Sequence, residues 1–223
     1  FGQDRHRDDL MEQAIVDMAA AGASIIDPAT LDNRRQYNAP AYQLMLYEFK
    51  ADLRAYFSTV SPELGMRSLE DLIAFNEANA DREMPYFGQE ILIAANEMGP
   101  LMDPEYLRFK ETARRLSQDE GIDRLMEQHR LDAIVAPTTR AAWKTDLING
   151  GMSSLGSSSP AAISGYPSIT VPMGSVRGLP IGMLFFGSAW SEGRLIQLAY
   201  SYEQATRHRR PARMLLTLDL RNA

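Results

Sequence analysis

Apolar residues recur at three- and four-residue steps in three long segments, which is the spacing of one buried helix face. These segments predict helices over residues 8–21, 104–128 and 191–207. Two further helices are predicted over residues 41–56 and 68–76, and Ser68 and Asp71 are spaced as in a capping box. Asp103 should cap the helix over 104–128, and Gly121 is a weak point inside it.

Short apolar runs bounded by glycine or proline predict strands over residues 23–28, 131–137, 168–173 and 181–186. The last two are close enough to form a hairpin. The mixture of helices and strands predicts the α/β class, with part of a mixed sheet flanked by helices. Too few residues precede the first helix to supply a partner for the strand over 23–28. We therefore expect that strand beside residues 131–136 or at an unpaired edge.

Composition excludes several classes of function. The net charge of −6 leaves no basic field for phosphates, so nucleic acid is not an expected partner. The absence of cysteine removes thiolate nucleophiles, disulfides and zinc–thiolate sites, and it leaves the compartment open. The three histidines are scattered without ligand spacing, so no metal site is predicted. No apolar run approaches the ~20 residues that a membrane-spanning helix needs, so no membrane partner is expected.

Two ordered strings in the last third of the chain form its most specific motif. They are AAISGYPSITVPMG at residues 161–174 and GLPIG at residues 178–182. Glycine and proline in these strings set turns and strand ends, and two tightly turned strands alone would explain them equally well. The full order, however, resembles the C-terminal block of the amidase signature family. The strings LDAIVAPT at 131–138, FGQE at 87–90 and WSEGRLI at 190–196 agree, so the resemblance covers nearly the whole chain. Residues 48–50 and 68–76 are most similar to the peptide-amidase-like branch.

The resemblance implies a fold and a chemistry. Residues 1–223 would form the C-terminal portion of an amidase signature domain, whose members cleave amides without a cofactor. In this family the nucleophilic serine and a second serine lie in a Gly/Ser-rich signature in the N-terminal half of the domain, and a lysine relays protons. This chain has no such signature, and Lys50, Lys110 and Lys144 lack its context. We therefore expect no catalytic residue here, a missing N-terminal portion as partner, and a small-molecule or peptide amide as substrate.

Five residues are predicted to line the substrate pocket. They are Gln89, Thr138, Ser157, Ser158 and Ser159. Thr138 follows a predicted strand, where it could bind a ligand or cap the next element. The serines lie in a Gly/Ser-rich loop that the resemblance places near the substrate, although such loops are also common polar turns. Gln89 matches a position where relatives with charged substrates carry polar or basic groups. These residues should converge on one concavity.

The sequence also allows two other functions. The chain could be a binding or assembly module that keeps an amidase-like fold without its active centre. It could also be a self-sufficient hydrolase built on Ser157–Ser159 with Lys144 as base, since a serine becomes nucleophilic when a neighbouring group takes its proton. The lack of a basic clamp around Gln89 argues against the glutamine-using amidotransferase subunits.

Overall fold

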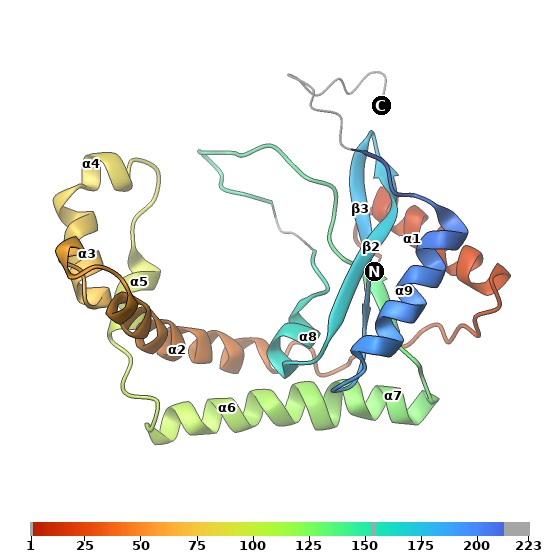
Figure 1. Ribbon diagram of the computed structural model, residues 1–223, viewed down its shortest axis with the longest axis horizontal. Helices are drawn as coiled ribbons and strands as arrows, with labels where there is room; N and C mark the ends of the chain where they lie inside the picture. Colours follow the sequence, from red (N-terminus) through yellow and green to blue (C-terminus); the bar gives the residue numbers. More distant parts are fainter. Residues whose placement is uncertain (1, 153–154, 212–223) are drawn as a thin grey trace. The chain divides into compact units, whose positions relative to one another are not determined.

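The structure is a computed structural model that describes residues 2–152 and 155–211 (Figure 1). The chain divides into two compact units, residues 1–34 with 117–223 and residues 35–116. We call them the sheet unit and the helical unit, and each is described by itself.

The described residues of the sheet unit contain a three-stranded antiparallel sheet with the strand order β1–β3–β2. Figure 1 labels its strands β2 and β3. The strands are β1 (Ile134–Pro137), β2 (Ser168–Val176) and β3 (Leu179–Phe186). β2 and β3 form the predicted hairpin. Arg177 and Gly178 at its turn have φ values of 51° and 78°, as a type I′ turn requires. The predicted α/β class with flanking helices is confirmed, and the strand pairs described are antiparallel.

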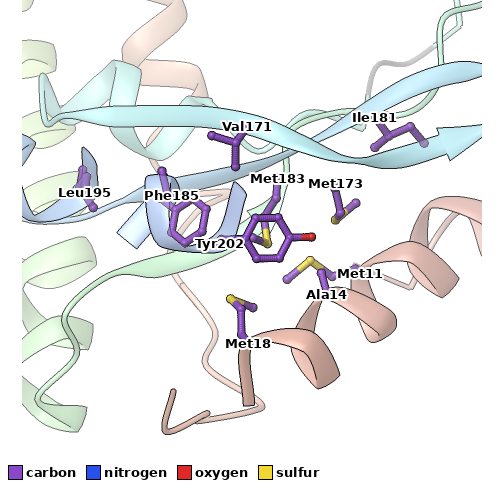
Figure 2. Packing of buried hydrophobic residues seen from close by; sticks show 11 residues of the cluster. Met11, Ala14, Met18, Val171, Met173, Ile181, Met183, Phe185, Leu195 and Tyr202 are labelled. Atoms are coloured by element: carbon purple, nitrogen blue, oxygen red, sulfur yellow. The ribbon is translucent and has the colours of Figure 1, made fainter. Parts of the chain in front are cut away.

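Helices α1 (Arg5–Ala20) and α9 (Glu192–Thr206) cover one face of this sheet. Met11, Ala14 and Met18 lie three and four positions apart, so they project from one side of α1. Figure 2 shows them directed at Met183 and at Tyr202 of α9. Met183 is fully buried. The helical period read from the sequence therefore marks the surface that packs on the sheet.

Shorter helical segments cover part of the second face. They are η2 (Gln118–Asp123), α7 (Arg124–His129) and α8 (Ser159–Ser164). Their buried residues pack with strand residues in a second core made of Ile122, Leu125, Ile134, Ala161, Leu184 and Phe186. Because side chains alternate along a strand, β3 sends Met183 and Phe185 into the first core and Leu184 and Phe186 into the second.

The long helix predicted over residues 104–128 is divided in the structure. It consists of α6 (Pro104–Ser117), the π-helical segment η2 and α7. The weak point Gly121 lies in the π-helical segment and is buried beside Ile122. The predicted cap is confirmed, since Asp103 Oδ1 accepts a hydrogen bond of 2.9 Å from the Glu105 amide.

Residues 23–27 form no strand, so the prediction of a strand over residues 23–28 is wrong. The apolar pattern is present, but Ile25 and Ile26 are 37% and 46% exposed. A strand exists only when a neighbour accepts and donates its backbone hydrogen bonds, and none of the described residues pairs with this segment. Residues 22–31 instead line a groove whose other wall is formed by residues 129–136.

The helical unit confirms the two remaining predicted helices. Its elements are α2 (Asn38–Thr59), the 3₁₀ turn η1 (Pro62–Leu64), α3 (Leu69–Ala78), α4 (Ala80–Glu83), α5 (Glu90–Asn96) and α6. Leu46, Leu69 and Ala95 form the centre of its core. The Asp71 amide donates to Ser68 Oγ at 3.2 Å, as the capping box predicts. Lys50 Nζ donates to the carbonyls of Asn96 and Met98 at the end of α5, so this lysine is a helix cap.

Candidate substrate-binding site

A pair of threonine hydroxyls lies where β1 ends. Thr138 Oγ1 and Thr170 Oγ1 are 2.6 Å apart, so one hydroxyl donates to the other. Gly182 of β3 lies opposite Thr138, whose amide donates to the Gly182 carbonyl at 2.8 Å. A Cβ at Gly182 would lie 2.5 Å from Thr170 Oγ1 and 2.9 Å from Thr138 Oγ1. The absence of a side chain at Gly182 therefore lets the two hydroxyls meet.

The alternation of side chains explains why both hydroxyls are on the second face of the sheet. Ile169 and Val171 of β2 pack into the core under α1 and α9, so Thr170 between them points the other way. Ile134 of β1 packs into the second core. Thr138 is an even number of positions further on, so it projects from the same face as Ile134.

This second face changes from apolar to polar along its length. Leu184 and Phe186 are buried, whereas Thr138 is half-buried and Thr170 is exposed. Each hydroxyl carries one proton, and the contact between the two uses only one of them. The pair can therefore donate one more hydrogen bond and accept others. A carbonyl or carboxamide group of a ligand would satisfy these groups.

Three hydrogen bonds hold the backbone of the Ser-rich loop, and one of them joins the loop to Thr138. The Ser157 amide donates to the Thr138 carbonyl at 3.1 Å. Arg34 donates to the Gly156 carbonyl at 2.6 Å, and Arg7 donates to the Leu155 carbonyl at 3.0 Å. Because the loop is tied to Thr138 directly, two of the predicted pocket residues, Thr138 and Ser157, lie together.

A network of acidic groups fixes Arg7. Asp8 Oδ1 accepts from Arg7 Nε at 3.2 Å and from Nη2 at 3.0 Å, and Asp4 is paired with Arg140 at 3.2 Å. The hydrogen bond from the Arg7 amide is the largest cause that holds the pKa of Asp4 below its ordinary value. Burial raises the pKa of Asp8, but hydrogen bonds from Asp4, Arg7 and Gly2 outweigh it and leave that pKa lowered. Both carboxylates are thus stabilised in their charged form.

A family model described as Amidase matches residues 2–196. The chain belongs to the amidase family. A probable amidase of Arabidopsis thaliana is 33% identical over 92% of this chain and 38% of its own length. The crystal structure of the native peptide amidase of Stenotrophomonas maltophilia is 48% identical, with a TM-score of 0.81 over 91% of this chain and 40% of its own. A peptide amidase in complex with the competitive inhibitor chymostatin gives 48% identity and a TM-score of 0.84 over 93% and 42%.

These relatives bear on the branch of the family that the sequence predicts. The peptide amidase structures confirm the resemblance to the peptide-amidase-like branch. The amidase-family chain spans about 40% of the length of the proteins compared above. The assignment of residues 1–223 to one portion of a larger amidase domain stays a prediction.

The two other serines predicted to line the pocket, Ser158 and Ser159, lie at the start of α8. Ser158 is exposed, and Ser159 is the first residue of the helix. Lys144 is exposed in the preceding loop. In the described ranges, no hydrogen bond joins Lys144 to Ser157, Ser158 or Ser159. The geometry thus contains no serine and lysine arranged for proton transfer in that part of the chain.

Gln89 belongs to the helical unit, where both ends of its side-chain amide are bonded. Asn76 Nδ2 donates to Gln89 Oε1 at 3.1 Å, and Gln89 Nε2 donates to the Ile73 carbonyl at 3.1 Å. These bonds join α3 to the start of α5, which gives Gln89 a structural role. Its predicted role in substrate binding, and its closeness to Thr138, stay predictions.

The described residues contain no group of three histidine, aspartate or glutamate side chains that could hold a metal ion. Within the same residues, none of the helices has both the length and the apolar character to cross a membrane.

The sequence placed Gly182 in its most specific motif without indicating the threonine pair beside it, and it did not single out Thr170, Arg7 or Arg34 as site residues. A signal for Thr170 was available, because Thr170 alternates with the apolar residues Ile169 and Val171. The contacts of Arg7 and Arg34 had no such signal, since Arg7 and Leu155 are 148 positions apart.

Replacing Gly182 with alanine is expected to lower the free energy of unfolding by about 1–3 kcal/mol, the usual cost of overpacking. The new Cβ would overlap both threonine hydroxyls, so the pair must separate. Urea unfolding followed by fluorescence measures the loss. Gly193→Ala is the control, because nothing lies within 4 Å of a Cβ there and alanine favours a helix. Adding Thr170→Ala should restore part of the stability, and no restoration would contradict the steric explanation.

Proposed function

We propose that this amidase-family chain is the substrate-side portion of a hydrolase that cleaves carbon–nitrogen amide bonds. The nucleophilic serine would belong to an N-terminal portion of the enzyme. The observation that carries this proposal is the pair of hydroxyls of Thr138 and Thr170 beside Gly182. This pair offers hydrogen bonds to a substrate but has no activated nucleophile beside it. The family model described as Amidase matches the chain that contains it.

In this proposal the N-terminal portion supplies the nucleophile, and this chain helps to orient the substrate. The serine attacks the amide carbonyl, an ester forms as ammonia or an amine leaves, and water then hydrolyses the ester. Backbone donors would stabilise the negative charge that develops on the carbonyl oxygen. The contribution of this chain is orientation, which lowers the barrier only if a nucleophile is held nearby.

The pocket wall is proposed to consist of Thr138, Thr170 and the loop Ser157–Ser159, with Gln89 as a further member. The contact between Ser157 and Thr138 supports the first part of this set. A hydroxyl of the threonine pair would donate to a carbonyl or carboxamide oxygen of the substrate.

The proposed substrate class is a peptide amide or a small uncharged amide. Two peptide amidase structures at 48% identity support this class, and one of them binds chymostatin as a competitive inhibitor. The threonine pair is neutral and suits an amide group better than a free carboxylate.

The chain alone is expected to release ammonia from peptide amides only at the background rate, because it has no activated serine. The assay compares the chain alone, the remainder of the S. maltophilia peptide amidase outside the matched region, and the two combined. Activity should appear only in the mixture. If the chain alone turns over substrate and Ser158→Ala abolishes that turnover, the Ser-rich loop is the active centre and the proposal is wrong.

The pocket-wall role is tested in the same mixture with Thr138→Val, which keeps the side-chain shape. Loss of one hydrogen bond worth about 1.5 kcal/mol should lower kcat/KM about tenfold. Ser58→Ala, at an exposed hydroxyl at the end of α2, should leave it unchanged. A mixture that binds substrate but never turns it over would favour a non-catalytic binding module.

A further inference from the structure

Two short segments lie side by side next to the threonine pair, although they are far apart in the chain. They are residues 138–140 and 155–157, and the Ser157 amide joins them by donating to the Thr138 carbonyl at 3.1 Å. Both segments carry residues that are proposed to line the pocket. Each segment is also bonded to a side chain at the start of α1, through a contact that the proposed reaction does not use.

The first contact joins Asp4 to Arg140. The two side chains are 22% and 17% exposed, and Arg140 Nη2 donates to Asp4 Oδ2 at 3.2 Å. Asp4 Oδ1 accepts from the Arg7 amide, also at 3.2 Å, so the two oxygens of Asp4 have different partners. One oxygen caps α1, and the other holds Arg140, which lies two positions after Thr138.

The second contact joins Arg7 to the Leu155 carbonyl. Arg7 is 3% exposed, and its Nη1 donates to that carbonyl at 3.0 Å. Its Nε and Nη2 donate to one oxygen of Asp8 at 3.2 and 3.0 Å. Because the guanidinium is planar and rigid, the bonds to Asp8 fix the direction in which Nη1 points. Asp8 therefore directs Arg7 at the segment that carries Ser157.

Leu155 has a backbone conformation that needs such support. Its φ value is 49°, in the left-handed region that residues with a bulky side chain rarely adopt. A strained conformation of this kind persists only where its surroundings hold it. Arg7 supplies a charged hydrogen bond to the same residue, and such bonds are stronger than neutral ones. The contact thus helps to set the direction in which the chain enters Ser157.

We propose that Asp4 and Arg7 are positioning residues for the substrate pocket. Each binds one of the two segments, so together they fix where Thr138 and Ser157 lie. Asp4 and Arg7 are three positions apart, about one helical turn, so one rigid element holds both segments. The inference rests on the proposed function, in which Thr138 and Ser157 line the pocket. Misplacing a substrate-binding group by about 1 Å can lower the rate about a hundredfold, so this support bears on turnover.

Residue-resolved hydrogen exchange of the chain tests the positioning without reference to activity. Arg7→Lys keeps the charge but loses the planar fork that reaches both of its acceptors. The Ser157 amide should then exchange at least about fivefold faster, while the Thr138 amide, bonded to β3 at 2.8 Å, should change less than about twofold. Arg5→Lys, at an exposed arginine of the same helix, is the matched control and should change neither amide.

A double-mutant cycle tests whether the contacts act through Thr138. The measurement is kcat/KM of the chain mixed with the remainder of the S. maltophilia peptide amidase. Asp4→Asn keeps an oxygen that can cap α1 but removes the charge opposite Arg140. Alone, it should lower kcat/KM at least about fivefold. Added to Thr138→Val, it should lower kcat/KM less than about twofold, because the hydroxyl that it positions is already gone.

Two control variants separate positioning from stability. Asp9→Asn is matched to Asp4→Asn, because Asp9 also lies opposite an arginine of α1, but Asp9 and Arg5 are 3.9 Å apart with side chains 68% and 89% exposed. Pairs so exposed contribute little, so kcat/KM should not change. Met18→Ala disturbs the core at the other end of α1. Any loss of active protein that it causes should be the same with and without Thr138→Val.

The outcomes separate the inference from the proposed function. An inactive mixture in which Arg7→Lys still accelerates exchange of the Ser157 amide alone would contradict the proposed function and support the positioning contacts. An active mixture in which Asp4→Asn has no effect, or the same effect with and without Thr138→Val, would contradict the inference and leave the function intact. Equal acceleration of the Ser157 and Thr138 amides by Arg7→Lys would show general destabilisation and overturn the inference.

Discussion

Replacing Arg7 with methionine is expected to lower the free energy of unfolding of the sheet unit by roughly 3 kcal/mol, the lower end of the range for breaking a buried ion pair. Arg7 is 3% exposed and bonds to Asp8 and to the Leu155 carbonyl. Methionine would fill much of the space but leave the Asp8 carboxylate without its cation. Urea unfolding followed by tryptophan fluorescence measures this unit, because Trp143 and Trp190 both belong to it.

Arg5→Met is the matched control in the same helix. Arg5 and Asp9 are 3.9 Å apart with side chains 89% and 68% exposed, and such surface pairs contribute at most about 1 kcal/mol. An equal loss of unfolding free energy in both variants would contradict the role of the buried network, because exposed Arg5 would then matter as much as buried Arg7. Loss in Arg7→Met alone would support the buried network.

The same network predicts the pH dependence. The pKa values of Asp4 and Asp8 are lowered in the folded chain. A carboxyl group with a lowered folded pKa contributes stability above its unfolded pKa of about 3.9, and that contribution is lost as pH falls through the folded value. Unfolding curves should therefore show stability falling below about pH 4. Arg7→Met should make that fall shallower, because one cause of the lowered Asp8 pKa is gone.

Met183→Ala is expected to cost about 2–5 kcal/mol, the range for truncating a large buried side chain. Met183 is 0% exposed at the centre of the core between the sheet and the helices α1 and α9 (Figure 2). Its neighbours include Met11 and Met173 in the same core, and alanine would leave a cavity among them. Fluorescence-detected unfolding again reports the sheet unit.

Two variants test the cause of that loss. Met183→Leu nearly conserves volume and should cost less than about 1.5 kcal/mol. Met152→Ala, at a side chain 58% exposed in the same sheet unit, should change little. Similar losses in Met183→Leu and Met183→Ala would show that the flexible shape of methionine matters more than its volume.

Helices, caps and the hairpin were predictable because their signals are local. The three- and four-residue spacing in α1 marks its buried side, and Ser68 with Asp71 marks the start of α3. The hairpin of β2 and β3 depends on turn residues next to the strands they join. The strand predicted over residues 23–28 failed because its apolar pattern is local but its hydrogen-bond partner is not.

The candidate site shows the same division. From the sequence, Thr138 was predicted as a pocket residue because it follows a strand, and Ser157 because the family resemblance places its loop near the substrate. The ordered motifs indicated the amidase family, which the family model confirms, and the roles of both residues stay predictions. Only the tertiary structure brought Thr170 to Thr138 across 32 positions, with Gly182 leaving space for both hydroxyls. Local patterns fix which face of an element is apolar. Strand pairing decides which distant polar groups share the opposite face, because the hydrogen bonds that set the register join segments far apart in the chain.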